Sequence, residues 1–258
     1  MSLTKHTATN LIFAIALSFL LFLNYKMPVS RVWFAFIVSL YLFVIALGSY
    51  LIELNFFTFS WCRGDNSRPL ISITFDDGPN SGTAGILDIL KKENVPATFF
   101  CIGANIKGNE SIIQKISSEG HLIGTHSFHH LWSFPLQASN KIAGEIKESQ
   151  ELVFGLIGKK PLLFRPPFGV TDPPIANAIK KTGVRSIGWS VRSYDTVISS
   201  PDKLLKRIRH IKNGDIILFH DKGLQTNVIL AGFIKNIRAQ GFEIIPLHEL
   251  LGIQAYEI

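Results

Sequence analysis

The chain has 258 residues, of which 47% are hydrophobic, and it carries a formal net charge of +7. A mean hydropathy of +0.27 is too high for an ordinary soluble enzyme. No nucleic-acid-binding motif accompanies the basic charge, so we expect no nucleic-acid partner. The two cysteines, Cys62 and Cys101, do not decide the compartment; Cys101 lies in a strand-like run and is expected to be a buried free thiol.

The apolar excess is concentrated at the front of the chain. Residues 11–23 form an uncharged apolar run, and residues 32–52 form a longer one that can cross a hydrocarbon core of ~30 Å as a helix rising 1.5 Å per residue. Lys5 ahead of the first run would suit a secretory signal, but no small-x-small cleavage site follows. We therefore predict a membrane anchor over residues 1–61, with two transmembrane helices at about 8–25 and 32–52.

Basic residues near the helix ends indicate how this hairpin is oriented. The turn between the helices carries Lys26 and Arg31, whereas Lys5 and the chain's amine precede the first helix. Positive residues favour the cytoplasmic side, so the turn is expected there. The N-terminus and the rest of the chain, residues 62–258, are then expected outside the cell or in the periplasm.

The first chemical signal is an alternating apolar run at residues 71–75 that ends in Asp76, Asp77 and a Gly-Pro turn. The run predicts a buried strand that stops where the turn begins. Carboxylates are seldom buried unless paired or metal-bound, and in an α/β barrel this end of a strand is where catalytic groups lie. Side chains of neighbouring residues in an extended strand point to opposite sides, so we expect one carboxylate on a metal and the other on a water. A surface turn is the alternative for the dipeptide alone.

Histidines with metal-ligand spacing follow the next predicted strands. His126 and His130 are four residues apart, which on a helical turn would place both imidazoles on one face, able to share an ion at roughly 2.0–2.1 Å. Two histidines and one carboxylate with open positions form the ligand set of a catalytic divalent metal. His129 is the competitor, because it could also pair with His126, and an isolated histidine pair is more often structural.

Three later apolar segments also place their first polar residues at their C-terminal ends. Residue 164 is followed by Arg165, a strand at 186–189 leads to charged residues at 192–195, and residues 216–219 end in His220. A core strand by itself does not need Arg, Asp and His at this position every time. The pattern predicts a ring of strand ends that face one site.

Residues 62–258 alternate strand-like and helical segments. The expected strands are residues 70–75, 97–102, 122–125, 162–164, 186–189, 216–219 and 243–246, and the expected helices are residues 82–93, 109–119, 137–157, 172–182, 201–212 and 225–239. This alternation predicts an α/β fold, an irregular seven-stranded (β/α) barrel that follows the two transmembrane helices.

Four stretches in this order resemble the motifs of the polysaccharide deacetylase family, the carbohydrate esterases that share a nodulation-type deacetylase domain. The matching stretches are residues 74–79, 126–130, 165–169 and 218–220. The first is identical to the family's Thr-Phe-Asp-Asp-Gly-Pro, and the second fits His-Ser/Thr-x-x-His, which selects His126 and His130 over His129. The resemblance covers roughly residues 68–250.

The resemblance implies a division of labour among these residues. Asp77, His126 and His130 would hold a divalent metal, most often zinc, with cobalt or a similar ion as alternatives. Asp76 would be the general base that takes a proton from water, and His220, with an unperturbed pKa of ≈ 6.5, would be the general acid.

The resemblance also implies supporting groups around this centre. Arg165 would pair with Asp76 and aim it. The backbone N–H of Phe168 would stabilise the oxyanion. Leu218 and Trp189 would line a small apolar slot for the acetyl methyl.

The family's fourth motif is altered in this chain. The family usually carries Asp-x-x-Asp-Trp, whereas this chain has Arg192 in place of the first Asp and Thr196 in place of the Trp. Because the first Asp orients the catalytic histidine in the family, we expect Asp195 to do this for His220; Asp221 is adjacent but is expected to point away. Arg192 either contacts an anionic group of the substrate or is a surface loop residue.

Three functions remain open at this level. The favoured one is a metal-dependent N-deacetylase that removes acetyl groups from amino sugars of a cell-envelope polysaccharide. The second is a deacetylase or deformylase of a lipid-linked amino sugar, and the third is a catalytically inactive, membrane-anchored sugar-binding protein. A basic stretch at residues 203–212 is expected to be a solvated helix face, with contact to anionic lipid headgroups as the alternative.

Overall fold

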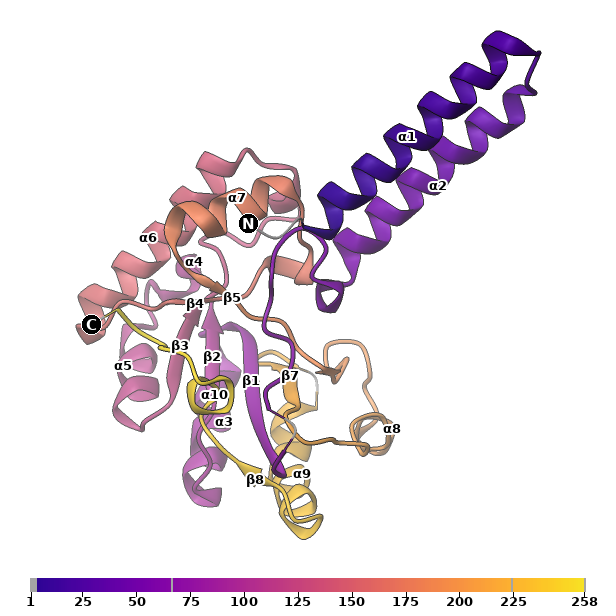
Figure 1. Cartoon of the computed structure of the whole chain (residues 1–258). Helices are drawn as coiled ribbons and strands as arrows, with labels where there is room; N and C mark the ends of the chain where they lie inside the picture. Colours follow the sequence, from indigo (N-terminus) through magenta and orange to yellow (C-terminus); the bar gives the residue numbers. More distant parts are fainter. Residues whose placement is uncertain (1–3, 66, 224, 258) are drawn as a thin grey trace.

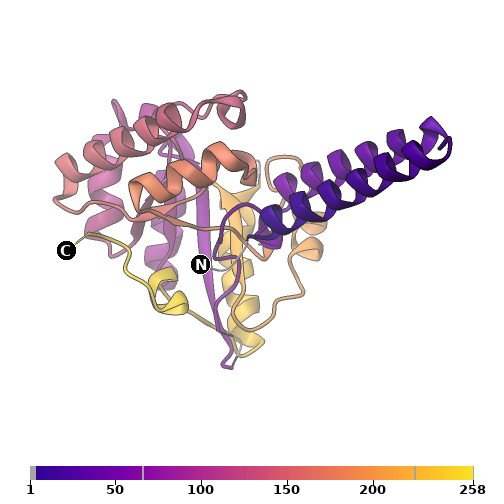
Figure 2. The ribbon, with the colours of Figure 1, turned by 45° about the horizontal axis from the view of Figure 1, so that its top comes forward.

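The computed structural model describes residues 4–65, 67–223 and 225–257, which form a helical hairpin and an α/β body (Figure 1). The hairpin consists of two long helices, α1 (Lys5–Lys26) and α2 (Arg31–Tyr50). Each begins at a polar cap, where the side chains of Thr4 and Ser30 accept a hydrogen bond from a backbone N–H of the first turn. Figure 2 shows that most of the hairpin stands clear of the body.

Large apolar side chains cover the outside of the hairpin. Within the described helices only Gly48 is buried, and Ile12 and Phe43 are each 63% exposed. Both helices are long and apolar enough to cross a membrane. The first is longer than the predicted 8–25, and the second ends at Tyr50 rather than at residue 52. A soluble monomer rarely exposes so large an apolar surface.

The body is built on one curled parallel sheet in the order β5-β4-β3-β2-β1-β7-β6, with β8 paired to the start of β1. The strands are β1 (Leu70–Gly78), β2 (Thr98–Cys101), β3 (Leu122–Thr125), β4 (Leu163–Phe164), β5 (Arg185–Ser186), β6 (Val191–Arg192), β7 (Ile216–His220) and β8 (Glu243–Ile244). The predicted α/β fold with seven strands in one barrel-like sheet is confirmed, as a half-barrel. Because the strands are parallel, their C-terminal ends meet at one edge.

Helices flank the sheet and pack in sequence against one another (Figure 1). Contacts run from α9 to α3, from α3 to α5, from α5 to α6 and from α6 to α7. The helices are α3 (Ser81–Glu93), α4 (Gly103–Ile106), α5 (Glu110–Ser118), α6 (Ser139–Ile157), α7 (Pro173–Thr182), α8 (Pro201–Arg207), α9 (Thr226–Ala239) and α10 (Leu247–Leu251), with short 3₁₀ turns η1 (Ile52–Leu54), η2 (Phe134–Leu136) and η3 (Pro167–Gly169).

The central strands are locked together by aromatic packing. The ring of Phe75 on β1 stacks on Phe99 of β2 at 5.1 Å and on Phe219 of β7 at 5.9 Å, and all three are buried. Such ring pairs stabilise a core beyond their buried area. The packing therefore fixes β1 and β7, whose ends carry Asp76, Asp77 and His220. Cys101 on β2 is buried and free, as expected.

Two predicted elements differ clearly from the structure. The expected strand at 186–189 is divided, because Ile187 bridges to Trp61 and the Gly188 N–H bonds to the Trp61 carbonyl, so that β6 starts only at Val191. The helix expected at 201–212 ends at Arg207, where the next residue, Ile208, turns inward and is buried. The helices α4 and α10 were not predicted.

The hairpin joins the body through packed contacts. Ser49 near the end of α2 accepts a hydrogen bond from the Thr171 N–H at 3.1 Å and donates its hydroxyl to the Thr171 carbonyl at 2.8 Å. Directly after α2, Ile52, Phe56 and Phe57 are buried. The segment that leads into the body is therefore folded onto it.

Candidate active site

Three strand ends place predicted polar residues around one pocket of about 430 Å³. Asp76 and Asp77 lie on β1, His126 follows β3, and His220 ends β7. Asp76 and His220 are register partners in neighbouring parallel strands. The sheet therefore brings a carboxylate and an imidazole from residues far apart in sequence to the same edge, as the sequence predicted for the ring of strand ends.

A bulge at the end of β1 turns both carboxylates toward the pocket. Asp76 pairs with Phe100 and Gly78 with Cys101, which leaves Asp77 as the extra residue, with a φ of 72°. The expectation that the two side chains point to opposite sides of an extended strand was therefore wrong. A bulge re-aims a side chain in this way.

Three potential ligand atoms gather beside this bulge. Asp77, His126 and His130 each offer one atom, and these atoms all lie within 4.8 Å of one another. Asp77 Oδ1 is 3.6 Å from His130 Nε2 and 3.7 Å from His126 Nε2. Their donor set, two imidazole nitrogens and one carboxylate oxygen, is one that divalent transition metals prefer.

The loop that presents the histidines is not the predicted helical turn. Ser127 and His130 both have positive φ values, 61° and 51°, so the backbone reverses twice within a few residues. Glu145 on α6 holds the loop by accepting the N–H groups of Phe128 and His129 at 3.1 Å. The His129 ring lies 3.8 Å from the same carboxylate and outside the ligand cluster.

The environment prepares these side chains for a cation. His126 Nδ1 lies 2.7 Å from the Arg165 carbonyl, which makes it the N–H donor and leaves the Nε2 lone pair toward Asp77. Burial and the neighbouring His126 lower the pKa of His130 to about 4, so its imidazole is neutral near pH 7. Burial alone would raise the pKa of Asp77, but His126, His130, His220 and Lys222 together outweigh it and the pKa is lowered.

Asp76 is held by a fully buried arginine. Arg165 Nη1 donates to Asp76 Oδ1 and to Thr74 Oγ1, each at 2.8 Å. The same guanidinium donates to the Gly188 carbonyl at 2.8 Å and lies 4.1 Å from the centre of the Phe100 ring. A buried charge needs such partners, and here they leave the guanidinium one orientation. Arg165 therefore fixes Asp76 through its side chain and His126 through its carbonyl.

His220 is bound to Asp195, which is 0% exposed. Asp195 Oδ1 accepts from His220 Nδ1 at 2.8 Å and from Ser193 Oγ at 2.9 Å. Asp195 Oδ2 accepts from the His220 N–H at 2.7 Å and from Thr226 Oγ1 at 2.6 Å. Burial alone would lower the pKa of His220, but the hydrogen bond to Asp195 and the nearby carboxylates raise it overall. Asp195 is thus placed where the sequence predicted a substitute for the family's orienting Asp.

Asp221 takes no part in this pair. Its carboxylate is buried and accepts a hydrogen bond from Thr83 Oγ1, and burial raises its pKa to about 7. Lys222, which the sequence did not indicate, reaches the pocket and places its Nζ 3.1 Å from Asp77 Oδ2.

Apolar and aromatic side chains form much of the remaining pocket wall. Leu218 and Trp189 line it as predicted, and Phe168 places its ring 4.7 Å from that of His130. Gly169 adopts a φ of 70°, and a Cβ there would lie 2.2 Å from the Trp189 ring. Glycine is therefore required where this loop meets Trp189. Trp132, which is 79% exposed, also lines the pocket and was not predicted.

Arg192 lines the pocket but does not orient His220, as the Asp at this position does in the family pattern. Its guanidinium lies 4.9 Å from the centre of the Tyr194 ring and 5.6 Å from that of Trp189. The partner of His220 is Asp195, so Arg192 is available for other contacts.

An Asp-His-His cluster flanked by a buried Asp–Arg pair and a buried His–Asp pair, at the strand ends of a curled parallel sheet, defines a metal-assisted hydrolase. Residues 63–187 match the family model described as polysaccharide deacetylase. This chain is more than 30% identical to a relative that it covers for most of that protein's length. It therefore belongs to the polysaccharide deacetylase family. Members of the family are carbohydrate deacetylases, which hydrolyse N-acetyl amide bonds.

Two relatives and one solved structure illustrate the similarity. A peptidoglycan-N-acetylglucosamine deacetylase of Bacillus cereus is 32% identical over 193 residues, which are 72% of this chain and 90% of that protein. The enzyme of the same name from Listeria monocytogenes is 34% identical over 184 residues, 70% of this chain but only 39% of that longer protein. A crystal structure of the Bc1960 peptidoglycan N-acetylglucosamine deacetylase gives a TM-score of 0.71 at 27% identity, over 77% of this chain and 95% of that one.

Proposed function

We propose that this chain is a membrane-anchored, metal-dependent N-deacetylase that acts on N-acetylated amino sugars of a cell-envelope glycan. The observation that carries the proposal is the meeting of three groups in one pocket: the Asp77–His126–His130 cluster, the Arg165-held Asp76 and the Asp195-held His220. The names of the Bacillus and Listeria relatives, peptidoglycan-N-acetylglucosamine deacetylases, support a glycan of this kind as substrate.

The residues present fit a divalent metal, most simply zinc. Asp77, His126 and His130 would hold it, since Asp77 is ionised, the His130 imidazole is neutral and His126 directs Nε2 into the cluster. When bound, such an ion supplies Lewis acidity, which lowers the pKa of water and polarises an amide carbonyl. Cobalt or a similar ion has the same donor preferences.

The Asp76–Arg165 pair and the His220–Asp195 pair each carry out one of the two proton transfers. Asp76, aimed by Arg165, accepts the proton of the attacking water. His220, whose raised pKa keeps a proton available, donates to the nitrogen of the leaving amine. Asp195 holds the Nδ1 side of the ring, so that Nε2 is the atom that gives up this proton. The base and the acid are thus separate groups on neighbouring strands.

The walls of the pocket select a small acyl group. Trp189 and Leu218 would enclose the acetyl methyl, and the backbone N–H of Phe168 would donate to the developing oxyanion. The tight contact between Gly169 and Trp189 keeps this loop against the slot.

The hairpin supports a membrane location for the enzyme. Its two apolar helices are largely exposed and stand clear of the body, and Ser49 near the end of α2 contacts the body at Thr171. With Lys26 and Arg31 at the distal turn, the positive-inside rule puts that turn in the cytoplasm and the catalytic domain, residues 62–258, outside or in the periplasm.

Acetate release tests the proposal. The full-length protein, purified in detergent and loaded with zinc, should release acetate from N-acetylglucosamine oligomers or peptidoglycan fragments. An inactive sugar-binding protein, the alternative reading, would bind such oligomers and release none. Metal analysis of the same sample separates loss of the metal from absence of chemistry.

A further inference from the structure

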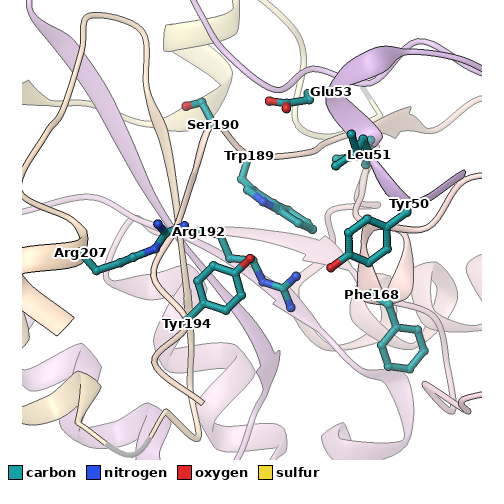
Figure 3. A pocket seen from close by; sticks show the side chains of 10 residues that line it. Tyr50, Leu51, Glu53, Phe168, Trp189, Ser190, Arg192, Tyr194 and Arg207 are labelled. Carbon is teal, nitrogen blue, oxygen red and sulfur yellow. The ribbon is translucent and has the colours of Figure 1, made fainter. Parts of the chain in front are cut away.

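A second hollow of about 190 Å³ adjoins the catalytic pocket (Figure 3). Phe168, Trp189 and Arg192 line both, so the two hollows meet around these side chains. The other wall of the second hollow comes from residues 50–53, where α2 ends and η1 begins. The catalytic pocket is therefore connected along one side to the base of the helical hairpin.

Two guanidinium groups give this hollow its positive charge. Arg192 and Arg207 each lie 4.9 Å from the centre of the Tyr194 ring. Over the described part of the chain, neither has a carboxylate within 4.0 Å, and the buried Arg192 Nε has no hydrogen-bond partner. In Figure 3 the Arg192 guanidinium and the Tyr50 hydroxyl point toward each other across the hollow. An unsatisfied guanidinium beside a hydroxyl is suited to bind an oxyanion such as phosphate.

One acidic residue also lines the hollow. Glu53 lies across the Trp189 ring from Arg192 (Figure 3) and opposes the binding of an anion. Removing the charge of Glu53 should therefore strengthen anion binding in the hollow, whereas removing the charge of an arginine should weaken it.

The hollow lies at the level where lipid phosphates are found. Tyr50 is the last residue of α2. At the end of a membrane-spanning helix, an aromatic residue of this kind sits among the headgroups. A phosphate held between Tyr50 and Arg192 could therefore remain attached to a lipid whose chains stay in the bilayer.

Building on the proposed function, we propose that the Arg192–Arg207 hollow binds the phosphate of an amino sugar carried on a lipid phosphate or diphosphate. The sugar then extends across Phe168 and Trp189, so that its N-acetyl group enters the catalytic pocket. The substrate class follows from this arrangement: a lipid-linked N-acetylated amino sugar, presented at the membrane surface.

Acetate release from three substrates by the full-length, zinc-loaded protein in lipid nanodiscs tests this inference. The substrates are N-acetylglucosamine joined through diphosphate to a long-chain lipid, the same sugar diphosphate without the lipid, and a neutral N-acetylglucosamine oligomer. Arg207→Gln is the deciding variant because Arg207 does not line the catalytic pocket. Arg209→Gln, an exposed arginine that bonds to His210, is the matched control.

We expect Arg207→Gln, which removes one of the two positive charges that line the hollow, to raise KM for the lipid-linked sugar severalfold and to leave the neutral oligomer unchanged. Glu53→Gln should lower the same KM, and Arg209→Gln should have no effect. Equal changes for the charged and neutral substrates would overturn the phosphate subsite. Equal KM values for the sugar diphosphate with and without its lipid would overturn the lipid assignment alone. If no substrate releases acetate while zinc is bound, the proposed function itself fails.

Discussion

Replacing Asp195 by Asn tests how this protein sets the protonation of its general acid. The carboxylate accepts four hydrogen bonds, two of them from His220, at distances of 2.6–2.9 Å in a fully buried position. Asn has nearly the same shape but carries no charge, and its amide NH₂ cannot accept from the donors that face it. The substitution therefore removes the charge while it preserves the volume of the site.

The effect should appear in the alkaline limb of the kcat pH profile. A hydrogen bond to a charged group contributes about 1.5–3 kcal/mol, so its loss should reduce the protonated fraction of His220 roughly ten- to hundredfold at a pH above the limb. Asp195 contributes to raising the pKa of His220, so its neutralisation lowers that pKa. The limb should accordingly move to lower pH while the zinc content stays unchanged.

The assay is acetate release between pH 5 and 10, with zinc measured in each sample. Arg192→Ala is the control, because its guanidinium rests on Tyr194 while His220 is bound to Asp195. If Asp195→Asn folds normally by circular dichroism and the alkaline limb of its kcat pH profile does not move, Asp195 is not the partner that raises the pKa of His220.

Three further predictions concern the Asp77–His126–His130 cluster and the proposed general base, Asp76. Exhaustive chelation should abolish activity, and zinc or cobalt should restore it; full activity with metal absent by elemental analysis would exclude the metal mechanism. His126→Ala and His130→Ala should lose zinc, whereas His129→Ala should keep it, since its ring lies against Glu145; equal losses would show that the wrong histidine was selected. Asp76→Asn should bind zinc normally yet lose turnover about 10²–10⁴-fold, and a near-normal rate would contradict its role as base.

The sequence predicted those parts of the site that depend on strand ends. Apolar runs that stop at a charged residue located Asp76, Arg165 and His220, because parallel strands carry such residues to one edge whatever lies between them. The altered fourth motif likewise pointed to Asp195, since this carboxylate follows closely after Arg192, which replaces the family's orienting Asp.

The geometry of the loops could not be predicted in the same way. Asp77 turns into the pocket through a bulge, and His130 does so through positive φ values, neither of which follows from residue spacing. Glu145 holds the histidine loop from a helix that begins well after it, and Lys222 follows a strand end without any motif. These contacts depend on tertiary packing, so local sequence carries no signal for them.

The docking of the hairpin on the body also limits the enzyme's working range. Ser49 is hydrogen-bonded to Thr171 in the segment just after Gly169, and Ile52, Phe56 and Phe57 beyond α2 are buried, so the connection is held against the body. A catalytic head on a long flexible tether could sample glycan far from its anchor. With the hairpin in a membrane, as proposed, a head fixed at the foot of these helices would work at one height and would meet substrates by lateral diffusion in two dimensions.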